Sequence, residues 1–166
     1  MSDYGLVYDD LAVDKMLKAT AGHPYFLQLL CHTLVNLQNR ERVNYVTVGD
    51  VNRALKEMLE LGEAHLAFLW ERATPWERAI LAAMARLVSA GESGAVRTVG
   101  TLLADYGLPA DHEVIRQTLQ RLAAHGTLRA VGEDRARYEF QVDLVRLWIE
   151  RSRSLTQAVH GVRSAE

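Results

Sequence analysis

The period of the sequence changes at Leu128-Arg129-Ala130-Val131-Gly132-Glu133-Asp134-Arg135-Ala136-Arg137-Tyr138-Glu139-Phe140. Before this stretch, apolar residues recur every three or four positions, which is typical of helices with one buried face. Within it, apolar and polar residues alternate on both sides of Gly132-Glu133-Asp134, which is a turn signal. We therefore predict a β-hairpin in a chain that is otherwise helical.

Three helices are predicted between Thr74 and this hairpin. The first begins at Thr74-Pro75-Trp76-Glu77, which combines a threonine cap, a proline at the first helical position and a glutamate three residues after the cap. A very short strand is expected at Ala95-Val96-Arg97, and the second helix opens at Thr98. The third helix is capped by Asp111 and closes at Gly126.

The order of helix, short strand, helix, helix and two-stranded hairpin is that of a winged helix-turn-helix with a small β-hairpin wing. Asp143 is expected to cap one final helix that buries Leu144, Leu147, Trp148 and Leu155. We assign residues 71–166 to this winged-helix domain and its C-terminal helix.

Residues 1–70 carry further helical segments and are assigned to a helical subdomain, so the fold class is mainly α. The first segment runs from about Asp10 to Ala19, with a loose apolar face made of Leu11, Val13, Met16 and Leu17. The second begins at Pro24 and ends near Asn39. Its apolar face includes Cys31, which we interpret as a small buried hydrophobic residue.

A third helical segment follows Thr47, where Asp50 completes a pattern that resembles a capping box. Its apolar face extends as far as Leu69, and Gly62 predicts a break within it, because glycine is unfavourable in a helix interior.

Composition excludes several classes of protein. The chain has 166 residues, of which 49% are hydrophobic and 24% charged, so it is not a disordered chain. It has no apolar run of the roughly 18–20 residues that cross a bilayer, and no secretory signal is visible at its start. The single cysteine excludes an intramolecular disulfide framework. We expect a soluble, cytoplasmic protein without a membrane partner.

No sequence motif of a catalytic or metal site is present. The phosphate-binding pattern GxxxxGK[ST] and the pattern GxGxxG are both missing. The six histidines show no spacing typical of metal ligands. We therefore assign no catalytic residue and no metal ligand, and expect that this chain is not an enzyme by itself.

Four segments in order resemble the C-terminal part of prokaryotic signalling ATPases of the STAND class, which are related to AAA+ proteins. These segments are Thr20-Ala21-Gly22-His23-Pro24-Tyr25-Phe26-Leu27-Gln28-Leu29-Leu30, Val46-Thr47-Val48-Gly49-Asp50-Val51, Thr74-Pro75-Trp76-Glu77-Arg78 and Tyr138-Glu139-Phe140-Gln141-Val142-Asp143-Leu144-Val145-Arg146-Leu147-Trp148-Ile149. In that family a P-loop domain precedes a helical lid and a winged helix. The resemblance implies that residues 1–70 are the lid and that the P-loop domain lies upstream in the same polypeptide.

The resemblance also implies a nucleotide-contacting site. Pro24 matches the lid proline that packs against the base or sugar of the nucleotide, and Gly22 and His23 shape that turn. Asp143 matches the aspartate of a His-Asp pair that senses the bound diphosphate, but the histidine position is Val142 here, which cannot donate a hydrogen bond. ATP or ADP with Mg²⁺ is thereby implied for the parent protein, with no cofactor held by this part alone. The resemblance also implies a protein effector and further copies of the same protein as partners.

Two other functions stay open. A winged helix can bind DNA, and the side chains available for this are Arg116, Gln117, Gln120 and Arg121 on the candidate recognition helix and Arg135 and Arg137 on the wing. From Trp70 onward, however, the sequence contains 13 Lys and Arg and 12 Asp and Glu, which gives a net charge of +1. Such a small positive charge neutralises few DNA phosphates. Nucleic acid is therefore the second choice, and a protein–protein interaction scaffold is the third.

Overall fold

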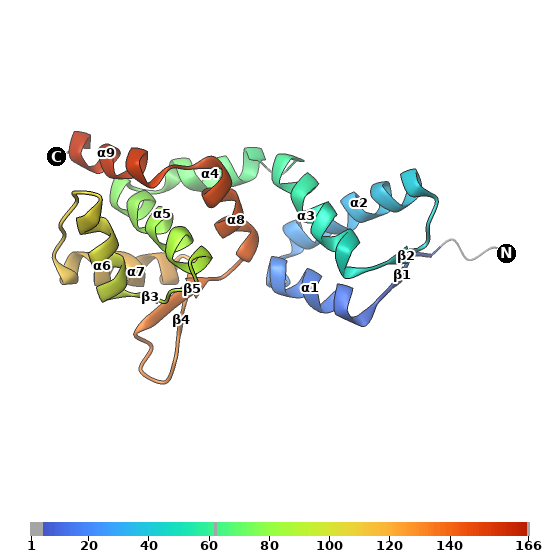
Figure 1. Ribbon diagram of the computed structural model, residues 1–166, viewed down its shortest axis with the longest axis horizontal. Coiled ribbons are helices and arrows are strands. Elements are labelled where there is room, and N and C mark those ends of the chain that lie inside the picture. Colours follow the sequence, from blue (N-terminus) through green and yellow to red (C-terminus); the bar gives the residue numbers. More distant parts are fainter. Residues whose placement is uncertain (1–4, 62, 166) are drawn as a thin grey trace. The chain divides into compact units, whose positions relative to one another are not determined.

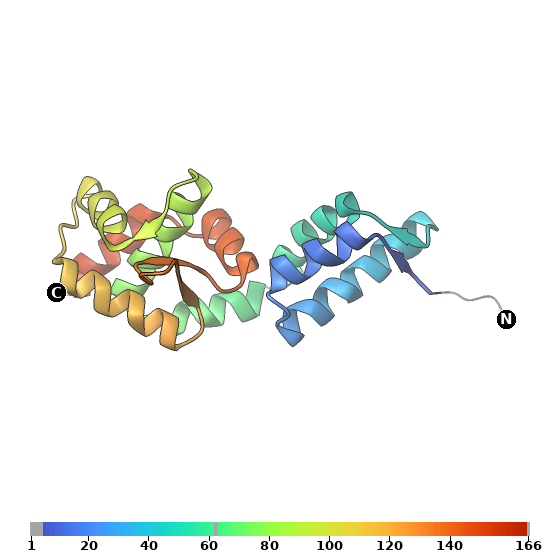
Figure 2. The same ribbon diagram turned by 90° about the horizontal axis from the view of Figure 1, so that it is seen from below.

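The computed structural model describes residues 5–61 and 63–165 (Figures 1 and 2). The described chain is mainly helical and carries a small three-stranded antiparallel sheet. It divides into two compact units. The first comprises the residues up to His65 together with Val142–Leu144, and the second comprises Leu66–Gln141 and the residues from Val145 onward. No helix of the described residues is long and apolar enough to cross a membrane.

The first unit is a helical body with one short parallel strand pair. Its elements are β1 (Val7–Tyr8), α1 (Asp10–Thr20), α2 (Pro24–Glu41), β2 (Tyr45–Val46), α3 (Val48–Leu61) and the start of α4 (Glu63–Arg72). The strands pair in register, Val7 with Tyr45 and Tyr8 with Val46. Helices α1, α2 and α3 pack against one another around a core of fully buried side chains, which include Phe26, Leu30, Leu34, Val51 and Met58.

Helix α1 differs from the sequence prediction in the face that it buries. Of the expected apolar face only Met16 is buried, while Leu11, Val13 and Leu17 are 66%, 41% and 48% exposed. The helix instead packs through Met16 with small side chains, Ala12 and Ala19 among them. The spacing of apolar residues correctly predicted a helix here, but its larger aliphatic side chains, Leu11, Val13 and Leu17, point toward solvent.

Helix α2 differs in two details from the sequence prediction, whereas the start of α3 agrees with it. Helix α2 continues to Glu41, two residues beyond the expected end near Asn39, and Cys31 is half-buried rather than buried. The carboxylate of Asp50 accepts the backbone N–H of Thr47 at 2.8 Å, and the Thr47 hydroxyl accepts the N–H of Asp50 at 3.3 Å, so the predicted capping box forms. The break predicted at Gly62 lies outside the described residues.

The second unit is built around one buried helix. Its elements are the rest of α4, α5 (Pro75–Ser89), β3 (Gly94–Ala95), α6 (Val96–Asp105), α7 (His112–Ala124), β4 (Leu128–Val131), β5 (Arg137–Phe140), α8 (Asp143–Ser152, from Val145 onward in this unit) and α9 (Leu155–Ala165). Helix α5 packs against α6, α7 and α9. The predicted capping box at its start forms, because Glu77 accepts the N–H of Thr74 at 2.8 Å and Thr74 accepts the N–H of Glu77 at 3.3 Å.

The predicted hairpin is present as β4 and β5, and β3 completes a sheet of order β3-β5-β4 (Figure 1). The short strand is Gly94–Ala95, and α6 begins at Val96 rather than at Thr98. Thr98 lies in the first turn of α6. Its hydroxyl accepts the backbone N–H of Ala95 at 3.1 Å, which satisfies a donor at the helix start.

The predicted single C-terminal helix is two helices, α8 and α9, separated by Arg153 and Ser154. The chain leaves the helix in a run of Ser152-Arg153-Ser154, and serine side chains compete with helical backbone bonds. The carbonyl of Ser154 then accepts the N–H of Ala158 at 3.0 Å, which begins α9. Leu69, expected on the apolar face that precedes α5, is exposed.

Candidate functional site

Three of the four residues with the implied nucleotide role, Gly22, His23 and Pro24, lie in the turn between α1 and α2, here called the α1–α2 turn (Ala21–Pro24). Ala21 and Gly22 both have left-handed backbone conformations, with φ of +50° and +68°. The N–H of His23 returns to the carbonyl of Thr20 at 2.9 Å, which closes the turn. Glycine adopts this conformation without strain, so Gly22 suits the position it holds.

Helix α2 starts with its positive end uncapped by a side chain. His23 is the N-cap residue, with φ −63° and ψ 120°, and its side chain makes no capping hydrogen bond. Pro24 is the first helical residue, and the first turn of α2 contains no acidic residue. The partial positive charge of a helix N-terminus is therefore not offset by a carboxylate within this turn of the chain.

Aromatic side chains surround this helix start. The Phe26 ring is 2% exposed and anchors the group in the core of the first unit. The ring of His23 lies 5.0 Å from it, and the ring of Tyr25 lies edge-on at 5.3 Å, both measured between centroids. Tyr25 remains 42% exposed, and His23 and Pro24 are also exposed. The α1–α2 turn thus offers flat apolar surfaces beside a positive helix end, which suits a ligand with a ring and an anionic group.

Sequence reasoning named Gly22, His23 and Pro24 but not Tyr25. The signal was present, because Tyr25 directly follows Pro24 and therefore lies in the first turn of the same helix.

Asp143 is the first residue of α8 and is half-buried. The segment Val142–Leu144 belongs to the same compact unit as the α1–α2 turn, although more than a hundred residues separate them in the sequence. Val142 is buried at 7% exposure. Asp143 lies in the first turn of a helix, where a carboxylate is favoured by the helix dipole.

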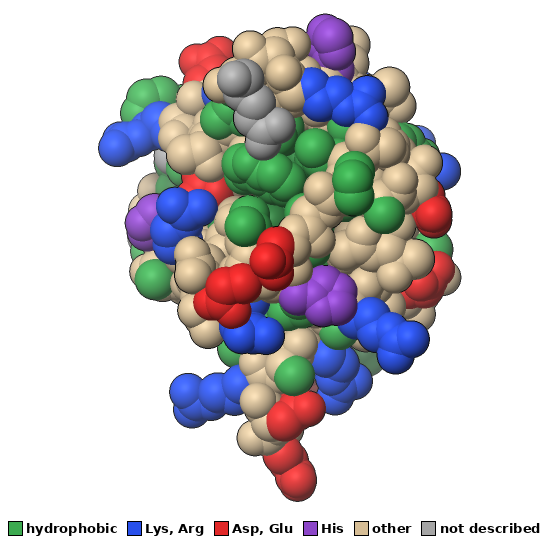
Figure 3. All heavy atoms as spheres, turned by 90° about the vertical axis from the view of Figure 1, so that its left-hand side faces the viewer, with side chains coloured by type: hydrophobic (Ala, Val, Ile, Leu, Met, Phe, Trp, Pro, Cys, Tyr) green, Lys and Arg blue, Asp and Glu red, His purple; other side chains and the backbone are tan. Residues whose placement is uncertain are grey.

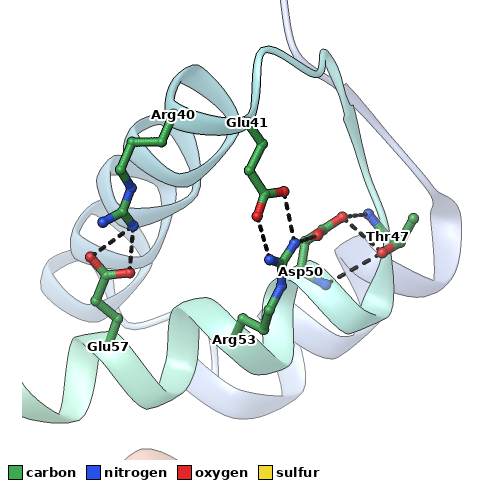
Figure 4. Close-up of polar contacts among 6 residues, drawn as sticks. All are labelled: Arg40, Glu41, Thr47, Asp50, Arg53 and Glu57. Carbon is green, nitrogen blue, oxygen red and sulfur yellow. Dashed lines mark hydrogen bonds and ion pairs between the residues drawn. The ribbon is translucent and has the colours of Figure 1, made fainter.

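A polar network that the sequence did not predict links α2 to α3 (Figure 4). Arg53 forms ion pairs with Glu41 and with Asp50, and Asp50 also accepts the hydroxyl of Thr47 at 2.8 Å. Burial raises the pKa of Asp50, but hydrogen bonds from the Thr47 backbone and from Arg53 outweigh it and hold the pKa at about 2. The hydrogen bond from Arg53 likewise lowers the pKa of Glu41.

A second ion pair, Arg40 with Glu57 at 2.8 Å, spans the same two helices (Figure 4). Its side chains are 59% and 36% exposed. Such exposed pairs contribute little to stability. The hydrogen bonds between the buried carboxylate of Asp50 and the exposed Thr47 therefore do most to fix the start of α3.

The candidate DNA-contacting residues all lie in the second unit, on α7 and the hairpin. On α7, Arg116 pairs with Glu113 at 2.6 Å, and the amide of Gln117 donates to Glu113 at 3.0 Å. Arg121 lies 3.4 Å from the hydroxyl of Thr118, and Gln120 is exposed.

The two hairpin candidates are differently placed. Among the described residues, neither the Arg135 nor the Arg137 side chain has a hydrogen bond or an ion pair. Figure 3 shows basic and acidic side chains interspersed over this face of the second unit, with acidic side chains at the end of the protruding hairpin. A continuous basic surface is not visible on this face.

Within residues 5–61 and 63–165, no group of His, Cys, Asp or Glu side chains is arranged to hold a metal ion. No model of a known protein family matches the sequence. Searches among curated proteins and among solved structures also find no match.

Proposed function

We propose that this chain is the lid and winged-helix part of a STAND or AAA+-like signalling ATPase. In this proposal the first unit closes over a nucleotide held by a P-loop domain of the same polypeptide. The second unit, a winged helix-turn-helix with β4 and β5 as its wing, couples the nucleotide state to oligomerisation or to an effector protein. The observation that carries the proposal is the α1–α2 turn, where Pro24 and the exposed Tyr25 ring stand at an uncapped helix N-terminus.

The chemistry of this turn suits one side of a nucleotide site. A proline presents a rigid apolar face to a base or sugar, and the helix dipole favours the negative phosphates. The sequence has no phosphate-binding loop, so the phosphates need a second domain that supplies one. A lid that contributes a turn and a helix end to a shared site fits both facts.

The exposed aliphatic side chains of the first unit support contact with a further domain. Val13 and Leu17 lie one turn apart on α1, so they share one side of the helix. Val7 and Tyr45, which are 53% and 47% exposed, are paired in register across β1 and β2 and therefore lie on one face of the strand pair. A further domain that packed against these two pairs would remove their exposed apolar area from water, which is favourable.

The lid role is tested by replacing Pro24 with alanine in the protein that carries the P-loop domain. We expect ADP affinity to fall by about threefold to tenfold, which corresponds to the loss of roughly one buried apolar contact. The matched control is Pro109→Ala, because Pro109 is an exposed proline of the second unit. Equal ADP affinity in Pro24→Ala and the wild type, with circular dichroism unchanged, would contradict the lid role.

We expect the chain by itself to hydrolyse no ATP. Purified chain is incubated with ATP and Mg²⁺, and released phosphate is measured. Turnover that persists through repeated purification, and that mutations in any copurifying ATPase leave unchanged, would refute this expectation.

The hairpin favours one alternative function, DNA binding by the winged helix. Arg135 and Arg137 have no carboxylate partner within the described residues, whereas Arg116 is occupied by Glu113. DNA binding should therefore depend on the hairpin more than on α7. Salt-dependent binding of duplex DNA that is weakened by Arg135→Ala and Arg137→Ala would favour this alternative over the signalling ATPase.

A further inference from the structure

The second unit has a hollow of about 460 Å³ that the proposed lid and wing do not use. It is lined by α5, by the residue after the end of α6, and by the junction of α8 and α9, and is here called the α5–α9 hollow. The buried side chains of Ala82, Ala85 and Ile149 form part of its lining. Its size is that of a site for a small molecule.

Arg86 stands at this hollow without an acidic partner. Its guanidinium lies over the ring of Tyr106, 5.5 Å from the ring centroid. Both residues line the hollow. In the described part of the chain, the Arg86 side chain has no hydrogen bond and no ion pair. The ring therefore holds the cation in place while its N–H donors stay available.

Arg153 contributes a second guanidinium, held in the same way. It lies 4.5 Å from the centroid of Trp148 and 5.8 Å from that of Trp70. Trp148 is 1% exposed, so the surface on which Arg153 rests is fixed. One nitrogen of Arg153 donates to the carbonyl of Ser152 at 2.9 Å, and no carboxylate among the described residues pairs with it.

Of the described residues, Glu150 is the only carboxylate that lines the α5–α9 hollow, and it is already engaged. Arg146 lies 3.2 Å from the carboxylate of Glu150 and also donates to the hydroxyl of Ser89 at 3.1 Å. The hollow is therefore lined by two guanidiniums, those of Arg86 and Arg153, while the charge of its carboxylate is neutralised by Arg146. Its electrostatics favour an anion.

Hydroxyl groups complete the set of donors. Ser154 and Thr156 line the hollow at the start of α9, and both are exposed. Together with two guanidiniums they offer more donors than the two oxygens of a carboxylate can accept. A phosphate group with three terminal oxygens matches this set, and guanidinium forks suit phosphate geometry.

We propose that the α5–α9 hollow binds a small phosphate monoester with an apolar or aromatic body. The phosphate lies between Arg86 and Arg153 and takes hydrogen bonds from Ser154 and Thr156. The body of the ligand packs on the alanine and isoleucine side chains that line the hollow. This inference is independent of the lid role, because the hollow lies wholly within the second unit.

The test is titration of the full chain with phenyl phosphate, with binding measured by calorimetry and by tryptophan fluorescence. Fluorescence is a suitable signal because Trp148 lies beneath Arg153. We expect saturable binding that Arg86→Gln weakens about tenfold or more, which is the loss expected for one charge-assisted hydrogen-bond partner. Thr156→Val should weaken it by a smaller factor. The control Arg97→Gln removes an exposed arginine of α6 that does not line the hollow, and it should leave binding unchanged.

Further probes separate the parts of the proposal. Benzoate carries the same ring with a carboxylate, and benzyl alcohol carries the ring with no charge. Binding of either one as tightly as phenyl phosphate would overturn the phosphate assignment. Absence of phenyl phosphate binding, or equal loss in Arg86→Gln and Arg97→Gln, would overturn the site itself. Arg86 is exposed, so its substitution leaves the core intact, and thermal unfolding of each variant confirms this.

Discussion

Replacing Asp50 with asparagine should destabilise the first unit through the start of α3. The carboxylate of Asp50 accepts the N–H and the hydroxyl of Thr47, both at 2.8 Å, and forms an ion pair with Arg53. Asparagine keeps one acceptor oxygen but loses the charge. Because asparagine has nearly the same size and shape as aspartate, the substitution tests the contribution of the charge of Asp50 alone.

The magnitude follows from the pKa of Asp50. Its fall from 3.8 to about 2 corresponds to about 2 kcal/mol of stability above pH 4. The Arg53 side chain is 51% exposed, and screening by water around it reduces the figure to about 1–2 kcal/mol. The folded pKa lies below the unfolded one, so this contribution is present above pH 4. It is lost as the pH falls from about 4 to about 2.

Hydrogen exchange of the segment 43–61 is the appropriate assay, because it reports the opening of β2 and α3 rather than of the whole chain. At pH 7, Asp50→Asn should lower protection there by about fivefold to thirtyfold. The matched control is Glu57→Gln in the same helix, which breaks the exposed pair with Arg40 and should cost about 0.5 kcal/mol or less. Urea unfolding by circular dichroism then follows the pH dependence.

Two results would refute this reasoning. In the first, Asp50→Asn and Glu57→Gln lower protection equally at pH 7, so the buried carboxylate has no special role. In the second, the stability difference between the wild type and Asp50→Asn stays constant from pH 6 to pH 2. That outcome would mean that the folded pKa of Asp50 is not lowered.

Three further predictions concern single positions. Thr74→Ala should cost the second unit about 1 kcal/mol in urea unfolding followed by tryptophan fluorescence, because it removes the cap of α5, and equal stability would contradict the capping box. Gly94→Ala should destabilise the second unit by about 2 kcal/mol or more, because the new Cβ would lie 2.5 Å from the carbonyl oxygen of Tyr138. Gly161→Ala on α9 should instead stabilise it by up to about 1 kcal/mol, because the new Cβ meets nothing within 4 Å. Thermal unfolding that ranks the two variants in the opposite order would refute this prediction. Burial raises the pKa of the Cys31 thiol, so Cys31 should react with iodoacetamide at pH 8 more slowly in the folded chain than in urea, and equal rates would show that its pKa is not raised.

Much of the fold could be predicted where local chemistry determines it. The capping boxes at Thr47 and Thr74 and the alternation on both sides of Gly132 each depend on residues within a few positions of one another. Such patterns can be recognised in the sequence because the interacting residues lie within a single helical or β-turn. The division of the last helix into α8 and α9 was not predicted. The serines on both sides of Arg153 were a local signal, but the contact of Arg153 with Trp70 of α4 joins residues more than eighty positions apart, and no local pattern reveals it.

The candidate site shows the same division. The turn at Gly22 and the helix start at Pro24 were readable from residue types alone. The network of Glu41 and Arg53 was not, because it joins side chains twelve residues apart on two helices whose relative rotation only packing decides. The hollow at Arg86 and Arg153 joins residues far more distant in the chain, so no spacing rule predicts it.

Helix α1 explains why periodicity alone misjudged a buried face. Its apolar residues occur on more than one side, so the sequence fixes a helix without deciding which side is inward. A unit that folded for stability alone would bury the larger side chains, because burial stabilises roughly in proportion to apolar area. The structure does the opposite, since Ala12 and Ala19 face the core while Leu11 and Leu17 stay about half exposed or more. Each such leucine forgoes roughly 1 kcal/mol of burial, a cost that a second domain packed on this helix would remove.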